Sequence, residues 1–211
     1  MKTLATVLLT LALTAGTILS ASAQFEGIIN VKRTKGTKIT NFRYHVAGNL
    51  LRIEELDGNG GIKHIMLVDA DEQTCYTLNT QRKVYMDAYN NRRVLPVNSR
   101  VTKTENTKEI AGYKCTEYIV RNEGEGTEVH YWIGGDEFRF FLPTLQVMNR
   151  KDKLARYFQV VPDPGAGFPI LGEEQDLNGK VRMRLEVVSF EKGEVDDAMF
   201  DIPEGYSEFE K

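Results

Sequence analysis

Few residues in this chain are of the kinds that build metal and redox centres. Its 211 residues include two cysteines and three histidines. His45, His64 and His130 stand on three separate predicted strands, and none has another histidine two or four residues away. Because metal sites are rarely built from scattered single residues, a structural or surface role explains each histidine better than metal ligation. The sequence therefore predicts neither a metal nor a cofactor.

The sequence also lacks the short motifs of common catalytic and ion-binding loops. It contains no Gly-x-Ser-x-Gly, no phosphate-binding glycine loop and no HExxH. The stretch that begins at Asp57 resembles the opening of a calcium loop, but Ile62 replaces the glycine at the sixth position and Val68 replaces the closing glutamate. No residue is therefore expected to be catalytic, and a hydrolase is left only as a site that converges from separate strands.

Positive charge is not in excess either. Lysine and arginine number 27 against 30 aspartates and glutamates, which gives a formal net charge of −3, and the basic residues are scattered along the chain. A nucleic-acid-binding domain needs a concentrated basic patch. The composition therefore excludes nucleic acid as a partner.

Only the N-terminus carries a long uncharged apolar run. Residues 4–19 contain no charged side chain, and Ala21-Ser22-Ala23 then supplies the small-x-small pattern that signal peptidase cleaves. The apolar part is shorter than the roughly 20 residues of a membrane-spanning helix, and Gln24 stands where a lipid anchor would need cysteine. We expect residues 1–23 to be a cleaved signal peptide and residues 24–211 to be one exported β-rich domain, periplasmic or extracellular, with no transmembrane segment.

Beyond the N-terminus, short runs of alternating apolar and polar residues dominate the chain. This period of two is typical of strands with one buried face, and glycine, asparagine and aspartate separate the runs as turn residues. Asn178-Gly179 is the strongest two-residue hairpin signal in the sequence. The pattern predicts antiparallel strands near residues 25–31, 41–46, 51–54, 62–68, 75–78, 84–86, 113–120, 127–133 and 181–187.

One interruption of this pattern has helical spacing. Pro143 suits the first turn of a helix whose apolar stripe runs toward Phe158. A polar segment, residues 151–153, breaks that stripe, and the glycine and proline of residues 161–169 predict an irregular loop. The expected fold is mainly β with α: a curved antiparallel sheet, or half-open barrel, closed by one or two helices.

Cys75 and Cys115 each fall inside a predicted strand. Export would place them in an oxidising compartment, which permits a disulfide between them. A bridge would stabilise the domain by about 4 kcal/mol on the chain-entropy model, but it requires Cα atoms within about 7 Å. Two separately buried thiols are the alternative, since cysteine is among the most buried residue types.

The most apolar part of the expected mature chain is an aromatic stretch, residues 131–142. Its side chains form either the core of the sheet and helix or the wall of a cavity for a hydrophobic ligand. On a strand, alternation sends Phe138, Phe140 and Leu142 to one face and Phe141 to the other. The cavity hypothesis assigns a ligand-lining role to Trp132, Phe138, Phe140 and Leu142, with Phe168 near the lid.

A set of short segments spread over most of the mature chain has a characteristic order and spacing. The segments are residues 51–54, 75–78 with Lys83 and Tyr85, 112–115 with Tyr118, 167–169 and 195–206. They resemble an uncharacterised family of exported bacterial proteins, catalogued as a domain of unknown function. Its architecture resembles that of the Lol-type periplasmic lipoprotein carriers, a curved antiparallel sheet closed by helices over an apolar cavity. The resemblance implies this fold, and it assigns no activity to any residue.

Three functions are compatible with such a fold. They are a non-enzymatic carrier or binding module for a lipid or acyl chain, a cell-envelope structural or assembly protein that binds a protein partner, and a hydrolase. An open apolar concavity favours the carrier. A filled concavity with an exposed apolar patch favours the assembly protein, and a cleft with a histidine beside a carboxylate or hydroxyl favours the hydrolase. The carrier is the leading hypothesis.

Processing provides the first test of these expectations. If the signal is cleaved after Ala23, intact-mass measurement of protein secreted by a bacterial host should give a chain that begins at Gln24, with or without cyclisation of that residue. A chain that retains Met1, or a lipid-sized mass increment at the new terminus, would contradict the assignment.

Overall fold

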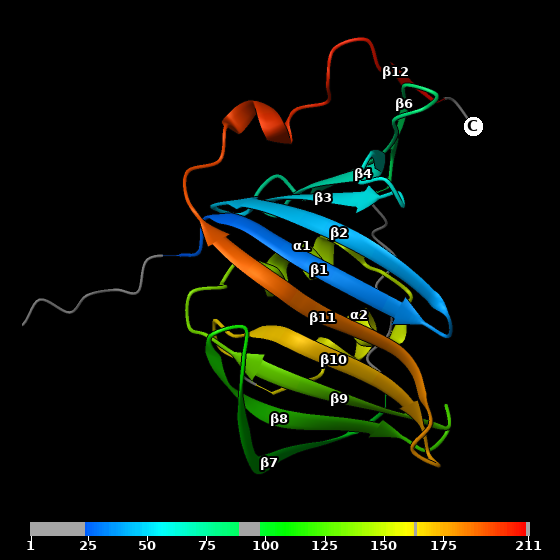
Figure 1. Cartoon of the computed structure of the whole chain (residues 1–211), viewed down its shortest axis with the longest axis vertical. Helices are drawn as coiled ribbons and strands as arrows, with labels where there is room; N and C mark the ends of the chain where they lie inside the picture. Colours follow the sequence, from blue (N-terminus) through cyan, green and yellow to red (C-terminus); the bar gives the residue numbers. More distant parts are fainter. Residues whose placement is uncertain (1–23, 89–97, 163, 210–211) are drawn as a thin grey trace, which may run out of the picture.

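The computed structural model describes residues 24–88, 98–162 and 164–209. Over these residues the chain forms a single curved sheet of twelve strands, with two short helices behind it in the view of Figure 1. The predicted fold class, a curved antiparallel sheet closed by helices, is confirmed; the sheet is open at both ends and does not close into a barrel. The expected signal peptide, residues 1–23, lies outside the described residues.

The strands run nearly the full length of the described chain. They are β1 (Gly27–Lys35), β2 (Lys38–Ala47), β3 (Leu50–Leu56), β4 (Ile62–Asp69), β5 (Thr74–Asn79), β6 (Val84–Asp87), β7 (Arg100–Ile110), β8 (Tyr113–Asn122), β9 (Thr127–Gly134), β10 (Phe168–Asp176), β11 (Val181–Lys192) and β12 (Ser207–Glu208). In space their order is β12-β6-β5-β4-β3-β2-β1-β11-β10-β9-β8-β7, antiparallel throughout except for the short β12–β6 pair.

The order shows two meanders joined at one seam. Strands β1 to β6 follow one another, as do β7 to β11, and β1 pairs with β11 from Gly27↔Lys192 to Lys35↔Met183. Gly27 is required where this seam begins. Its φ is 139°, and a Cβ there would lie 2.1 Å from the carbonyl oxygen of Glu191.

The helical segment differs from the single helix predicted from Pro143 to Phe158. The structure has two helices, α1 (Phe141–Met148) and α2 (Lys153–Phe158). Asn149 ends α1 in the left-handed conformation, and Asp152 caps α2 by accepting a hydrogen bond from the amide of Ala155 at 3.1 Å. Neither helix is long and apolar enough to cross a membrane, nor is any other helix among the described residues.

Two other segments differ from the prediction. Residues 138–142 do not form the strand on which their alternation was expected, because β9 stops at Gly134, within one residue of its predicted end, and Gly135 adopts a positive φ of 78°. The alternation argument for those residues is therefore wrong. The irregular loop predicted to run to Pro169 ends sooner, because β10 begins at Phe168.

The two faces of the sheet are covered differently. The main apolar core lies between the concave face and the helices. On the convex face, a smaller apolar cluster around Ile65, Leu67 and Leu78 is covered by the C-terminal segment through Ile202 and Tyr206. This segment also contains the short helix η1 (Asp197–Phe200), and the Arg52 guanidinium donates to the carbonyl of Met199 at 2.9 Å.

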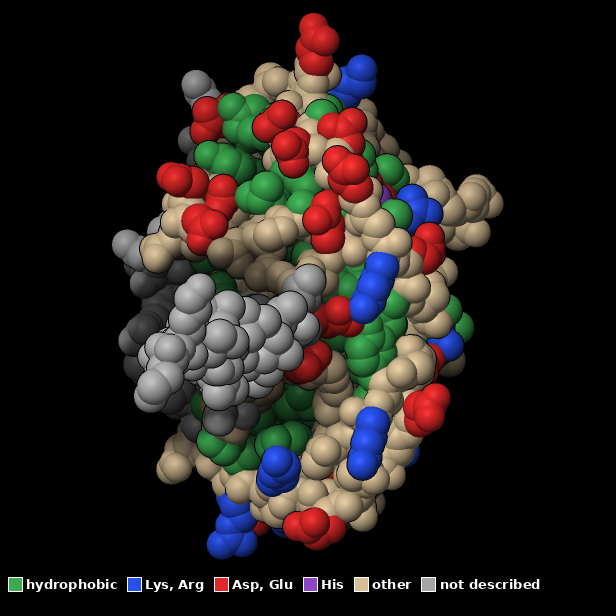
Figure 2. All heavy atoms as spheres, turned by 90° about the vertical axis from the view of Figure 1, so that its left-hand side faces the viewer, with side chains coloured by type: hydrophobic (Ala, Val, Ile, Leu, Met, Phe, Trp, Pro, Cys, Tyr) green, Lys and Arg blue, Asp and Glu red, His purple; other side chains and the backbone are tan. Residues whose placement is uncertain are grey.

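The C-terminal segment gives one end of the molecule a negative surface. Residues 194–208 contain six acidic side chains and no lysine or arginine. Figure 2 shows acidic side chains gathered at the top of the molecule, the end where η1 and β12 lie in Figure 1. This acidic surface is separate from the concave face.

Strand β7 is the last strand of the sheet among the described residues. Most of its side chains are exposed, and its pairing with β8 changes register between Lys103 and Thr107. The strand carries charges on Lys103, Glu105, Lys108 and Glu109. It therefore forms an irregular, charged edge.

Cys75 and Cys115 are both buried and unpaired. Cys75 lies on β5 and Cys115 on β8, and strands β4, β3, β2, β1, β11, β10 and β9 come between them in the sheet. The structure thus contains the two separate thiols and no bridge. Burial raises the pKa of the Cys75 thiol to about 11 and also raises the pKa of Cys115.

These thiols should be unreactive until the protein unfolds, because reaction requires an accessible thiolate. A chromogenic thiol reagent should label folded protein slowly at neutral pH. In denaturant without reductant, it should find two thiols per chain. Absence of free thiol in the unfolded, unreduced protein would contradict the structure and restore the disulfide.

Candidate functional site

A cavity lies on the concave side of the sheet, beneath the two helices. Its volume is about 100 Å³, and its wall is contributed by strands on both sides of the β1–β11 seam and by α1 and α2. The lining from the strands and their flanks is Val31, Arg33, Phe42, Tyr44, Ile53, Tyr131, Phe168, Pro169, Gly172, Met183, Leu185 and Val187, and that from the helices and their connection is Phe141, Leu145, Met148, Arg150, Asp152, Leu154 and Ala155.

Strand register explains why distant residues share this wall. Val31 on β1 pairs with Phe42 on β2 and with Val187 on β11, and Tyr44 on β2 pairs with Ile53 on β3. Directly paired residues point to the same face of a sheet. The central strands therefore present a continuous apolar surface to the helices.

Two contacts hold α2 close to this surface. The Tyr131 hydroxyl donates a hydrogen bond to the carbonyl of Leu154 at 2.7 Å. Gly172 on β10 faces the same helix, and a Cβ at Gly172 would lie 3.2 Å from a methyl of Leu154. On the other helix, the Phe141 ring packs edge-on against Phe168 with centroids 4.5 Å apart. The helices thus close the cavity through specific contacts.

The wall also contains a small polar group. Arg150 Nε lies 2.8 Å from Asp152 Oδ2. Burial alone would lower the pKa of Arg150, but the neighbouring carboxylate raises it, so this pair is ionised. The Arg33 guanidinium sits 4.7 Å from the centroid of the Phe42 ring and forms no ion pair with a carboxylate of the described residues. Burial raises the pKa of Tyr44, so its phenol is neutral. The charged residues of the lining are Arg33, Arg150 and Asp152, so the cavity has one net positive charge.

The five residues assigned to a cavity wall from the sequence lie in different places. Phe168 lines the cavity. Phe138 and Phe140 are fully buried outside the lining, and Leu142 is a half-buried residue of α1 outside it. Trp132 points away from the cavity, with Lys108 Nζ 3.7 Å from the centroid of its ring.

Sequence reasoning missed other residues of the wall. Phe141, which was expected to point away, lines the cavity because it belongs to a helix and not to a strand. Arg33 also lines the cavity, and it continues the alternation of Ile29 and Val31 along β1. An arginine at an inward-facing strand position is a signal that the sequence alone contains.

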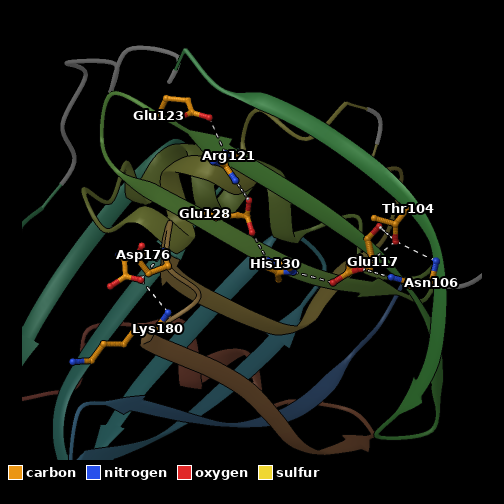
Figure 3. Close-up of polar contacts among 10 residues, drawn as sticks. Thr104, Asn106, Glu117, Arg121, Glu123, Glu128, His130, Asp176 and Lys180 are labelled. Carbon is orange, nitrogen blue, oxygen red and sulfur yellow. Dashed lines mark hydrogen bonds and ion pairs between the residues drawn. The ribbon is translucent and has the colours of Figure 1, made fainter.

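Figure 3 shows a polar network on the opposite face, where His130 lies between two glutamates. Its Nδ1 is 2.9 Å from Glu117 Oε1 and its Nε2 is 2.8 Å from Glu128 Oε1. Glu117 also accepts hydrogen bonds from Thr104 and Asn106, at 3.1 and 2.8 Å. His130 precedes the cavity residue Tyr131, so strand alternation places it on the convex face. Both ring nitrogens are occupied within the protein.

The remaining histidines form no comparable centre among the described residues. His45 is buried, with its Nε2 3.3 Å from Glu54 Oε2, and Arg52 Nε lies 2.8 Å from the other oxygen of Glu54. His64 is half-buried on β4. Across the part of the chain that the structure describes, no three histidine, cysteine, aspartate or glutamate side chains are arranged to hold a metal ion.

Solved structures share this fold at low sequence identity. An uncharacterised conserved protein from Thermus thermophilus matches with a TM-score of 0.54 and 13% identity, over 87% of this chain and 90% of that one. PNGF-II matches with a TM-score of 0.52 and 11% identity over 87% of this chain, which spans only 31% of PNGF-II.

A weaker match concerns the Lol-type architecture. A candidate outer membrane lipoprotein-sorting protein domain from Vibrio parahaemolyticus aligns with 82% of this chain and 88% of its own length, at 8% identity. Its TM-score of 0.35 is too low to establish a common fold.

A family model gives a more direct relationship. No curated protein matches the sequence. The model of a domain of unknown function, DUF4412, matches residues 25–206, which is most of the chain and confirms the family resemblance seen in the sequence. The chain therefore belongs to the DUF4412 family.

Proposed function

We propose that this protein is an exported, non-enzymatic binding or carrier module for a hydrophobic ligand that contains an acyl chain. The observation that carries the proposal is the apolar cavity between the concave sheet and the two helices. Ligand sites are typically concave and mostly apolar, with a few placed polar groups. Arg33, Tyr44 and the Arg150–Asp152 pair are such groups here.

The size of the cavity limits how much ligand it holds. At about 100 Å³ it is smaller than the roughly 300–1,000 Å³ of most ligand pockets. A short chain, or the end of a longer one, fits this volume, and a longer insertion requires α1 and α2 to move from the sheet. Each buried methylene contributes about 0.8 kcal/mol, so micromolar affinity after the ordering cost requires a medium-length chain and hence movement of α1 and α2.

The residues proposed to contact the chain follow from this geometry. Phe168 stays in the ligand-binding set, joined by Phe141, Leu145 and Leu185. We place Phe138 and Phe140 behind the wall, where they support it.

The alternative functions fit the observations less well. An envelope assembly protein is favoured by a filled concavity, and here the concavity contains a cavity. A hydrolase requires a base that can take a proton from its substrate. His130 is the histidine with the closest carboxylate partners, but both of its ring nitrogens are already bonded to glutamates. We therefore propose a structural role for His130.

A titration with a fluorescent fatty acid tests the carrier proposal. Leu185 is half-buried in the cavity wall, so the indole of Leu185→Trp should fill part of the cavity. Two or more methylenes of the ligand would then no longer be buried, and the affinity should fall at least about tenfold. Wild type should bind saturably. Val188→Trp, on the same strand but 60% exposed, is the matched control and should bind like wild type.

Circular dichroism should show that both tryptophan variants are folded. A folded wild type that does not bind, or equal affinity in Leu185→Trp and wild type, would contradict the carrier proposal. The envelope assembly function would then become the leading one.

The structural role of His130 predicts a pH-dependent contribution to stability. Burial alone would lower the pKa of His130, but the hydrogen bonds and charges of Glu117 and Glu128 outweigh burial and raise this pKa above 6.5. Burial alone would raise the pKa of Glu117, but the hydrogen bonds that Glu117 accepts outweigh burial and lower this pKa below 4.5. The raised pKa of His130 stabilises the folded protein below about pH 6.5. This stabilisation is lost as the pH rises through the pKa of His130 in the folded protein. The lowered pKa of Glu117 stabilises the folded protein above about pH 4.5. This stabilisation is lost as the pH falls through the pKa of Glu117 in the folded protein.

His130→Gln should therefore reduce the free energy of unfolding most between about pH 5 and 6.5, by about 1–2 kcal/mol. The reduction should shrink toward pH 9. Urea unfolding across this range measures the effect, and His64→Gln, which removes a histidine without ion pairs among the described residues, is the control. A loss of stability that is the same at every pH would argue against the ionised network.

A further inference from the structure

Arg33 is unusual among the arginines that line or face this sheet. Arg150 in the cavity pairs with Asp152, and on the convex face Arg121 and Arg184 each pair with glutamates. Arg33 contacts the Phe42 ring, but within the described residues no carboxylate lies within ion-pair distance of it. A cation at an apolar wall without a counter-ion is costly unless it is solvated or paired with an anion. Arg33 is half-buried, so its guanidinium can pair with an anion that enters at the cavity wall.

Tyr44 adds a neutral hydrogen-bond donor at the same polar part of the wall. Burial raises the pKa of Tyr44, and the Asp152 carboxylate adds to this, while Arg150 and Arg33 act to lower it, so both guanidinium groups lie near the phenol. Among the described residues, no hydrogen bond contributes to the pKa of its hydroxyl. The hydroxyl remains protonated at neutral pH and is available to a ligand oxygen.

The positive charge of the cavity does not reflect a basic surface. The whole chain has a net charge of −3, and the C-terminal end is acidic (Figure 2). The unpaired cation is instead located beside apolar side chains, including Met183 and Leu185. An apolar wall next to one cation is complementary to an amphiphile with an apolar tail and an anionic head.

We infer that the ligand is an anionic amphiphile, with a carboxylate or phosphate head that forms an ion pair with Arg33 and accepts a hydrogen bond from Tyr44. The inference rests on the proposed carrier function and specifies the ligand class of the same cavity. The tail lies along Leu145 and Leu185 toward Phe168. Arg150 contributes less, because Asp152 already neutralises it.

Calorimetric titration of the mature chain with eight-carbon probes separates the head from the tail. Octanoate and octyl phosphate test the two head chemistries, and 1-octanol carries the same tail without charge. Wild type should bind at least one anionic probe about tenfold to hundredfold more tightly than octanol, the range of a charge-assisted hydrogen bond. The anionic probe with the greater affinity relative to 1-octanol identifies the head chemistry.

The variants should change the head preference and leave the tail affinity intact. Arg33→Gln should remove most of the anion advantage without changing octanol affinity, and Arg33→Lys should restore part of it, because a lysine keeps the charge but loses the planar fork. Tyr44→Phe should weaken anion binding a few-fold. Arg82→Gln removes an exposed arginine in the β5–β6 turn and should have no effect.

Two outcomes would overturn the inference, and they are distinguishable. Equal affinity of wild type for octanoate, octyl phosphate and octanol, or parallel loss of anion and octanol binding in folded Arg33→Gln and Arg33→Lys, overturns the anionic head while the carrier proposal stands. Failure of all three probes to bind folded wild type overturns both.

Discussion

The pairing of β1 with β11 is the constraint on which the other features of this molecule depend. It joins two meanders that share no other strand pairing within the described chain, and its partners are as distant as Gly27 and Lys192. Closing so long a loop has a large entropic cost, which must be met by burial on the faces of the sheet. Without this seam, Val31 and Arg33 would not lie beside Val187 and Leu185, and the cavity wall would be divided between two unconnected sheets.

The seam also explains why the two faces of the sheet are chemically different. Each strand of the seam alternates, so apolar side chains such as Val31 and Val187 face the helices while Lys32 and Glu186 pair on the other face. The convex face continues this pattern through Arg184–Glu173 to His130. Cross-strand charge pairs keep the convex surface polar along the seam, so at the seam the apolar area is buried on the concave face.

Much of the fold could be predicted from the sequence, for local reasons. The alternating runs matched strands because half of each strand is buried, and Asn178-Gly179 does join β10 to β11. Strand β7 was missed because nearly all its side chains are exposed, which removes the alternation that marks a strand. The end of β9 was predicted to within one residue, but residues 138–142 were interpreted as strand because the aromatic run continues after the backbone has turned at Gly135.

The candidate site was less predictable than the fold. Phe168 was identified because it is a large apolar residue next to a loop, but Arg33 and Phe141 were not. Their roles depend on which residues of distant strands and helices face them. The alternation along β1 indicates that Arg33 faces inward, but its neighbours there, and those of Phe141, arise only from the packing of the whole sheet with its helices.

The irregular edge at β7 has a consequence for solubility. A free strand edge presents unpaired amides and carbonyls to which another chain can add. In β7 the register change between Lys103 and Thr107 interrupts that row, and Lys108 and Glu109 place charge beside it. A second molecule cannot extend an unbroken ladder along such an edge. The strand that is hardest to recognise in the sequence thus makes its edge of the twelve-stranded open sheet a poor template for fibrillar aggregation.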